Sequence, residues 1–200
     1  MAAPEDAKSV LHQYLRAQRD ALVAKLDGLG EYDIRRPMTP TGTNLLGLVK
    51  HVGSVQLGYL GEVFGRASYD LDLPWLDDEA DAEGADMWAT ADESREFILD
   101  FYRTSCERAD ATIGALELDS PGVVPWWAAE RRDVTLHRVL VHLCVEVARH
   151  AGHADILREN IDGATGNRNE HPVQDDPKAW STFVGRIEGA AQQVRDRAEG

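Results

Sequence analysis

The sequence predicts an all-α protein built on a four-helix bundle. Four long segments repeat apolar residues with helical periodicity, and the stretches between them are rich in Gly, Pro and Asp. No segment alternates polar and apolar residues convincingly, as a half-buried strand would. Long helices with connections of medium length are typical of a bundle, and 200 residues can bury the core of one domain.

The first two helices are expected over about 4–26 and 45–64. Apolar residues of the first fall on or near one face, which is the pattern of a helix packed against a core. Thr43 and Asn44 are both suitable N-cap residues for the second helix, because their side-chain oxygens can accept from the free N–H groups of the first turn. Gly65 is a suitable residue to end it.

The third helix is expected to begin at Thr90, because Thr90 and Glu93 have the spacing of a capping box. The fourth is expected to follow Asp133 and to continue to Ile161, and a shorter helix over about 178–197 completes the chain. These helices predict one domain.

We expect this single helical domain to span 1–200, with the bundle core at about 4–163 and a C-terminal extension at 164–200. The connection over 66–89 is long for a compact bundle. A solvated acidic loop is the favoured interpretation, and a cation-collecting or lid function is the alternative. The acidic residues of the loop are Asp70, Asp72, Asp77, Asp78, Glu79, Asp81, Glu83 and Asp86.

Composition narrows the functional classes. A net charge of −14 argues against binding to nucleic acid, which depends on cations that neutralise phosphates, and against binding to anionic membrane surfaces. No run approaches the ~18 apolar residues of a membrane span, and the N-terminal residues lack the pattern of a secretory signal. We therefore expect a soluble, cytoplasmic protein. Two cysteines are too few for a disulfide framework or a four-Cys zinc site, so any metal must be held by His and carboxylates.

The fourth helix carries the most informative pattern. At about 100° per residue, His142, Glu146, His150 and His153 fall within about 80° of one another. They share a stripe with aliphatic residues that should face the core. An unpaired carboxylate in such a seam costs several kcal/mol, so it requires a compensating charge or a proton. A divalent cation is one answer, and a hydrogen-bonded Glu146–His150 pair is the structural alternative.

A metal needs a third ligand from another helix, and His51 of the second helix is the natural candidate. It shares its face with the small residues Gly47, Ser54 and Gly58, which leave space above an inward imidazole. Ligands contributed by facing helices are how bundles build metal sites. Three protein ligands leave a coordination position open, which is the arrangement of catalytic sites. The sequence thus predicts a site formed by His51, Glu146 and His150.

The same segments carry a family resemblance. GTNLLGLVKH at 42–51, VPWW at 124–127 and EVARHAGHADILRE at 146–159 resemble the DinB superfamily, and more narrowly its branch of mini-circle and mycothiol-transferase-like proteins. LPWL at 73–76 and DMWATADE at 86–93 are similar too. The resemblance extends from about residue 11 to 163. It implies a bundle with up-down-down-up topology and a His/His/His or His/Glu/His metal site.

At the site itself, Glu146 and His150 match the paired ligands of the last bundle helix, as in mycothiol-dependent maleylpyruvate isomerase. His153 stands where many relatives have Gln. The isomerase activity is not carried over, because this chain lacks the sizeable C-terminal domain of that enzyme. The resemblance instead implies a metal-dependent S-transferase that activates a low-molecular-weight thiol such as mycothiol and conjugates it to a small electrophile.

Zinc is the expected ion, and nickel, iron and manganese also suit the donor set. His153 or His142 could accept the thiol proton, since imidazole titrates near neutral pH. Trp126 and Trp127 could line the substrate pocket or simply pack the loop. Arg158 could meet a substrate carboxylate, although a salt bridge is the simpler expectation. His12, His137 and His171 lie off the site and are interpreted as surface or loop residues.

Two alternative functions stay open at this point. A metal-dependent hydrolase would hold water at the open position, with Glu or His as the base. A stress-associated protein that binds a metal or a ligand without catalysis is the second alternative. The resemblance also makes a homodimer plausible, although no residue demands one.

Overall fold

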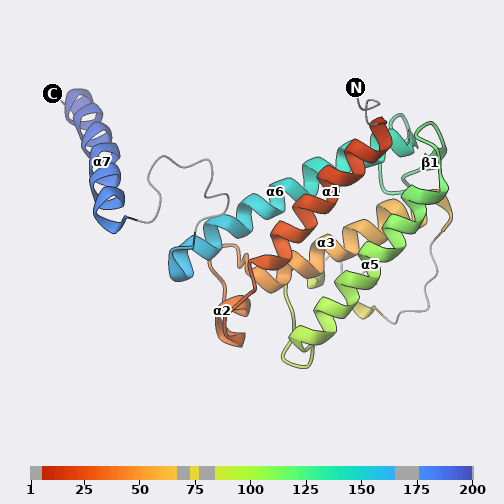
Figure 1. Cartoon of the computed structure of the whole chain (residues 1–200), viewed down its shortest axis with the longest axis horizontal. Coiled ribbons are helices and arrows are strands. Elements are labelled where there is room, and N and C mark those ends of the chain that lie inside the picture. Colours follow the sequence, from red (N-terminus) through yellow and green to blue (C-terminus); the bar gives the residue numbers. More distant parts are fainter. Residues whose placement is uncertain (1–5, 67–72, 77–83, 165–175, 200) are drawn as a thin grey trace, which may run out of the picture. The chain divides into compact units, whose positions relative to one another are not determined.

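The computed structural model describes residues 6–66, 73–76, 84–164 and 176–199. It confirms the all-α bundle. Four long helices build it, and they are α1 (Ala7–Ala24), α3 (Leu45–Leu60), α5 (Arg95–Ala115) and α6 (Leu136–Asp162). Figure 1 shows them together with the short α2 (Glu31–Arg35). α7 (Pro177–Glu199) belongs to a second unit of the chain.

The bundle has the expected up-down-down-up topology. In Figure 1, α1 and α6 run in one direction, whereas α3 and α5 run in the other. α1 packs mainly on α6, α5 packs on α3, and α3 also packs on α6. Parallel neighbours need a connection as long as the helix itself, which is about 24 Å for the 16 residues of α3. The long segment between α3 and α5 therefore has a topological reason.

Among its described residues, three short 3-10 helices lie on this connection or at its start. They are η1 (Glu62–Phe64), η2 (Pro74–Leu76) and η3 (Ala85–Met87). Of the acidic residues predicted to form a loop here, only Asp86 is among the described residues. The other seven lie outside them, as does His171.

The connection between α5 and α6 contains a small hairpin that the sequence did not predict. β1 (Pro121–Val123) pairs antiparallel with β2 (Asp133–Thr135), and Gly122 lies opposite Val134. Three residues per strand are too short for an alternating pattern to stand out. A Cβ atom at Gly122 would lie 2.7 Å from the ring of Phe64, so the hairpin approaches the end of α3 closely.

Some helix ends follow the predicted caps and others differ. α3 ends at Leu60 with Gly61 as its C-cap, before η1, and α6 begins at Leu136 after the N-cap Thr135 rather than directly after Asp133. The side chain of Asn44 accepts from the N–H of Gly47 at 2.8 Å, and Gly65 has the left-handed φ of 62° that ends the segment. The prediction that α5 begins at Thr90 was wrong, because Ser94 is the N-cap and the helix begins at Arg95. The Glu93 carboxylate does accept from the N–H of Thr90, at 2.7 Å, but in the turn before the helix.

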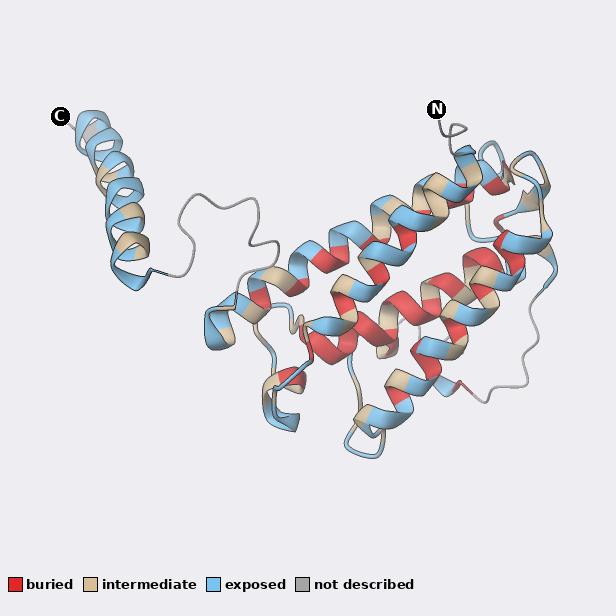
Figure 2. Cartoon of the chain, viewed as in Figure 1, coloured by how far each residue is buried: buried red, intermediate tan, exposed pale blue. Residues whose placement is uncertain are grey.

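The core lies between α3 and the other three long helices, and α3 is the most deeply buried helix, as Figure 2 shows. Leu15, Leu46, Ile98 and Leu140 are fully buried, so each long helix contributes to the core. None of the described helices is long and apolar enough to cross a membrane.

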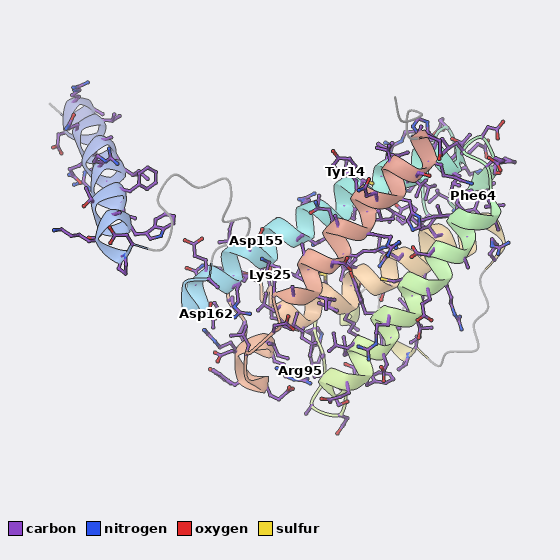
Figure 3. All side chains as sticks on the ribbon, viewed as in Figure 1. Tyr14, Lys25, Phe64, Arg95, Asp155 and Asp162 are labelled. Carbon is purple, nitrogen blue, oxygen red and sulfur yellow. The ribbon has the colours of Figure 1, made fainter. Side chains whose placement is uncertain are left out.

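Charged residues tie α1 to its neighbours. Lys25, just beyond α1, contacts Asp155 of α6 at 2.6 Å, and both are labelled in Figure 3. Asp110 of α5 accepts from His12 at 2.8 Å and from the buried Arg19 at 2.5 Å. Burial raises the pKa of Asp110, but the hydrogen bonds and charges of His12 and Arg19 outweigh it, so the net pKa is lowered. The expectation that His12 is only a surface residue was therefore incomplete.

Candidate metal centre

Three potential ligands from two helices converge on one point. His51 comes from α3, whereas Glu146 and His150 come from α6, and one ligand atom of each lies within 4.8 Å of the others. Oε1 of Glu146 lies 2.9 Å from Nε2 of His150 and 3.8 Å from Nε2 of His51. The two imidazole rings are 4.7 Å apart between centroids. Donors around a tetrahedral zinc ion are about 3–3.5 Å apart, so this group fits a divalent cation with small adjustments.

Local sequence explains the convergence. Glu146 and His150 are four residues apart, so their side chains project to the same side of α6. His51 faces them because α3 packs against α6. Glu146 is less buried than the apolar stripe suggests, since 26% of its side chain is exposed, whereas His150 is buried. The site is therefore anchored in the core and open on one side.

The charge states of Glu146 and His150 suit a cation. Burial raises the pKa of Glu146, but the hydrogen bond from His150 and the nearby imidazoles outweigh it, so the net pKa is lowered. Burial lowers the pKa of His150, and the hydrogen bond to Glu146 offsets this only in part. An ionised carboxylate beside neutral imidazole at neutral pH is the protonation state that metal binding requires.

The Nδ1 atoms of the two imidazoles differ in their surroundings. Nδ1 of His51 lies 2.6 Å from Oδ2 of Asp86, which is carried by η3. Nδ1 of His150 is buried and has no hydrogen-bond partner among the described residues. Only the His51 ring is thus held from both sides, by Asp86 on one and by the ligand cluster on the other.

The segment that carries Asp86 is attached to α3 by a buried lysine. Lys50 is 1% exposed, and its ammonium donates to the carbonyls of Ala85 and Trp88 at 2.9 and 3.0 Å. It also contacts both carboxylate oxygens of Glu93, at 2.8 and 2.9 Å, and lies 4.2 Å from the ring centroid of Trp75. Burial lowers the pKa of Lys50, and the hydrogen bond and charge of Glu93 counteract that effect.

The small residues beside His51 do not leave the open volume that the sequence suggested. A Cβ atom at Gly47 would lie 1.8 Å from the carbonyl oxygen of Met87. Ser54 accepts a hydrogen bond from the indole of Trp75 at 3.0 Å, and Gly58 lies against the ring of Trp126. These positions are small because two segments approach α3 closely there: the connection between α3 and α5, here called the crossing segment, and the loop between β1 and β2, here called the hairpin loop.

The two tryptophans of the hairpin loop belong to an aromatic cluster. Trp126 and Trp127 both donate to the hydroxyl of Tyr59, at 3.3 and 2.9 Å. The Tyr59 ring lies 4.6 Å from the ring of His142. Burial lowers the pKa of His142, while the charge of Glu146 raises it to a smaller extent. The cluster thus reaches α6 at His142, one turn before Glu146.

The other predicted site residues lie at different distances from the ligand group. The exposed His153 has its ring 5.6 Å from that of His150. Arg158 bonds Asp162 at 2.7 Å and the carbonyls of Lys25 and Asp27. These bonds match the salt bridge that was the simpler expectation, and a contact with substrate stays a prediction. His137 is exposed on α6.

The two cysteines are poor nucleophiles. Burial raises the pKa of Cys106 and of Cys144, and the charge of Arg19 only partly counteracts it. The thiolate is the reactive form, so a raised pKa lowers the reactivity of a thiol at neutral pH. Neither cysteine belongs to the ligand group.

Sequence reasoning missed three residues around this group. Asp86 was hidden within a run of acidic residues, and Lys50 carried no sign that its charge would be buried. Tyr59 had a usable signal, because it follows His51 by eight residues and so falls on a neighbouring part of the same helix face.

Comparisons with known proteins give a family and a fold for the chain. The model of the mycothiol-S-transferase family matches residues 10–163. The crystal structure of a conserved protein from Enterococcus faecalis is similar, with a TM-score of 0.55 and 15% identity, covering 80% of this chain and 99% of that one. At that identity the likeness shows the fold alone. A comparison with curated proteins gives no match.

Proposed function

Since the chain belongs to the mycothiol-S-transferase family, we propose that it uses a divalent ion, zinc in the first place, to conjugate a low-molecular-weight thiol such as mycothiol to a small electrophile. The observation that carries this proposal is the convergence of His51, Glu146 and His150 within 4.8 Å. Three protein ligands leave a coordination position that a thiol could occupy.

The chain's own residues would hold and orient the reactants. A cation held by His51, Glu146 and His150 would lower the pKa of a thiol at the site and would offset charge during the transfer. His142 is the preferred proton acceptor, because burial keeps its imidazole neutral at pH 7, and the exposed His153 is the second candidate. The thiol gives its proton to the imidazole, and the sulfur forms a bond to the electrophilic carbon as the bond from that carbon to its leaving group breaks. The imidazolium then gives the proton to a basic leaving group or, when chloride leaves, to solvent.

The thiol in this proposal comes from outside the protein. Cys106 and Cys144 have raised pKa values and stand apart from the ligands, so they are unsuited to act as the nucleophile. Trp126 is half exposed beside Tyr59, whose ring also contacts His142, and this position suits a wall for the electrophile. Cytoplasmic location follows from the same proposal, since small thiol cofactors serve the reducing compartment.

Metal content tests the first part of the proposal. Protein purified without chelator or polyhistidine tag should contain about one equivalent of divalent metal, measured by plasma mass spectrometry, which also identifies the ion. His51→Ala, Glu146→Ala and His150→Ala should each lower the content. His137→Ala is the matched control, because this exposed imidazole lies on α6 outside the ligand group. A wild-type protein without metal under these conditions would contradict the proposal.

Conjugation tests the second part. We expect mycothiol and 1-chloro-2,4-dinitrobenzene to react faster with the protein than without it, with the gain lost in His51→Ala and retained in His137→Ala. A rate that never exceeds the uncatalysed thiol reaction would refute the transferase function. Hydrolysis of model esters or amides without any thiol would favour the hydrolase instead.

A further inference from the structure

A histidine ligand needs its ring fixed as well as its nitrogen in reach. Imidazole binds a metal through an unprotonated nitrogen, so the proton of the neutral ring must reside on the other nitrogen. That choice is set by the hydrogen bond that the other nitrogen makes. Metal-binding histidines therefore commonly donate to a carboxylate or carbonyl behind them.

We propose that Asp86 is a positioning residue for His51, and that Lys50 holds the segment that presents it. The inference rests on the metal site of the proposed function. Oδ2 of Asp86 lies 2.6 Å from Nδ1 of His51, whereas Nε2 of the same ring faces Oε1 of Glu146 at 3.8 Å. With the proton on Nδ1 and donated to Asp86, the lone pair of Nε2 points toward the ligand group.

Burial makes this contact specific. The side chains of His51 and Asp86 are 19% and 12% exposed, so the contact is shielded from competing water. Asp86 is the one acid of the acidic run that the described residues place against α3. A carboxylate in that position also adds negative charge behind the ligand, so it would strengthen binding of a cation.

Three contacts from α3 and its N-cap fix the turn around Asp86. The Lys50 ammonium binds the carbonyls of Ala85 and Trp88, which flank Asp86 in the chain. Asn44 donates to the carbonyl of Met87 at 3.2 Å. Gly47 permits this carbonyl to lie where a Cβ atom would otherwise stand. The residues that begin α3 and precede His51 thus build the support for its orienting acid.

Metal affinity of three variants tests the proposal. Zinc dissociation constants would be measured by competition with a chromophoric chelator. Asp86→Ala should weaken binding by about 10–100-fold, whereas Asp86→Asn should lose less than tenfold, because its amide oxygen can still accept from Nδ1–H. Asp92→Asn is the control: it removes the same charge from an exposed position nearby and should change affinity less than twofold. Unfolding of each metal-free variant by urea would verify that the fold is retained.

A purely electrostatic effect of Asp86 predicts a different pattern. If only its charge mattered, the Ala and Asn variants would lose the same affinity, and that result would overturn the positioning function. An Asp86→Ala variant with wild-type affinity would overturn it as well.

The second readout needs no metal. Nitrogen-15 shifts of the His51 ring in the metal-free protein at pH 8 should report a proton on Nδ1 in wild type and a mixture of tautomers in Asp86→Ala. If Asp86→Ala loses the tautomer preference but the wild-type protein binds no zinc, the result would contradict the proposed function but not the orienting contact. If the wild-type protein binds zinc but the His51 tautomer is unchanged in Asp86→Ala, the result would contradict the orienting contact alone.

Discussion

The buried Lys50–Glu93 pair offers the sharpest test of how the site is supported. Glu93→Ala leaves the Lys50 ammonium with two carbonyls, the face of Trp75 and the more distant charge of Asp86, but without a hydrogen-bonded carboxylate. Removing one partner of a buried pair typically costs 3–5 kcal/mol, because the remaining charge stays desolvated. Glu93 is 15% exposed and the carbonyls remain, so the lower end applies, about 3 kcal/mol.

Urea denaturation of the metal-free protein, followed by circular dichroism, measures this cost. A loss of about 3 kcal/mol corresponds to a fall in Tm of roughly 6–12 °C for a domain of this size. Glu96→Ala is the matched control, because this exposed glutamate lies in the first turn of α5. It should change the free energy of unfolding by less than about 0.5 kcal/mol.

A double-mutant cycle isolates the interaction between the two side chains. The double variant Lys50→Met/Glu93→Met removes both charges. Its loss in free energy of unfolding should therefore be smaller than the sum of the losses in the two single Met variants. A Glu93→Ala cost below about 1 kcal/mol, or losses that simply add, would refute the reasoning that this pair clamps the crossing segment to α3.

Three further predictions concern other parts of the bundle. Gly47→Ala should destabilise the protein by about 3 kcal/mol, because a Cβ atom there would overlap a backbone carbonyl. Gly152→Ala should stabilise it by up to about 1 kcal/mol, because a Cβ atom at this position of α6 would meet open space. Thermal melts would distinguish the two variants. Because the pKa of Asp110 is lowered in the folded protein, its carboxylate contributes stability that is fully present above the unfolded pKa near 3.8 and is lost as the pH falls through the folded pKa. The Tm of Asp110→Asn should therefore fall less steeply than that of the wild type between about pH 4 and 2. An equally steep loss in the variant would contradict this. In the native protein, the two cysteines should react with Ellman's reagent at pH 8 more slowly than free cysteine does. In guanidinium their rates should be comparable to that of free cysteine. Native rates equal to that of free cysteine would show that the pKa values of the two thiols are not raised.

Much of the fold could be predicted from residues that act locally. Asn44 and Gly65 mark the ends of the second helical segment because capping depends on a side chain and its immediate backbone. Thr90 and Glu93 showed the limit of such signals, because a tertiary contact with Lys50 decides what the Glu93 carboxylate does. The short hairpin was missed for a related reason, since it is held by its neighbours rather than by its own pattern.

The candidate site was predictable where one helix carried the pattern. Glu146 and His150 share a helix face, and this follows from helical geometry alone. His51 could be added because it was expected on a facing helix, beside small residues and opposite the Glu146–His150 pair. Asp86 could not, since its pairing with His51 depends on the path of a crossing segment, and the sequence records only that this segment is acidic.

The ligands of the candidate site come from opposite halves of the bundle. His51 belongs to the half made by α3 and α5, and the other two belong to the half made by α1 and α6. A bound ion would therefore act as a cross-link between the halves, and it would stabilise the native state by an amount that grows with the logarithm of free metal concentration. Chelation should accordingly raise amide hydrogen exchange first along the seam where the two helix pairs meet.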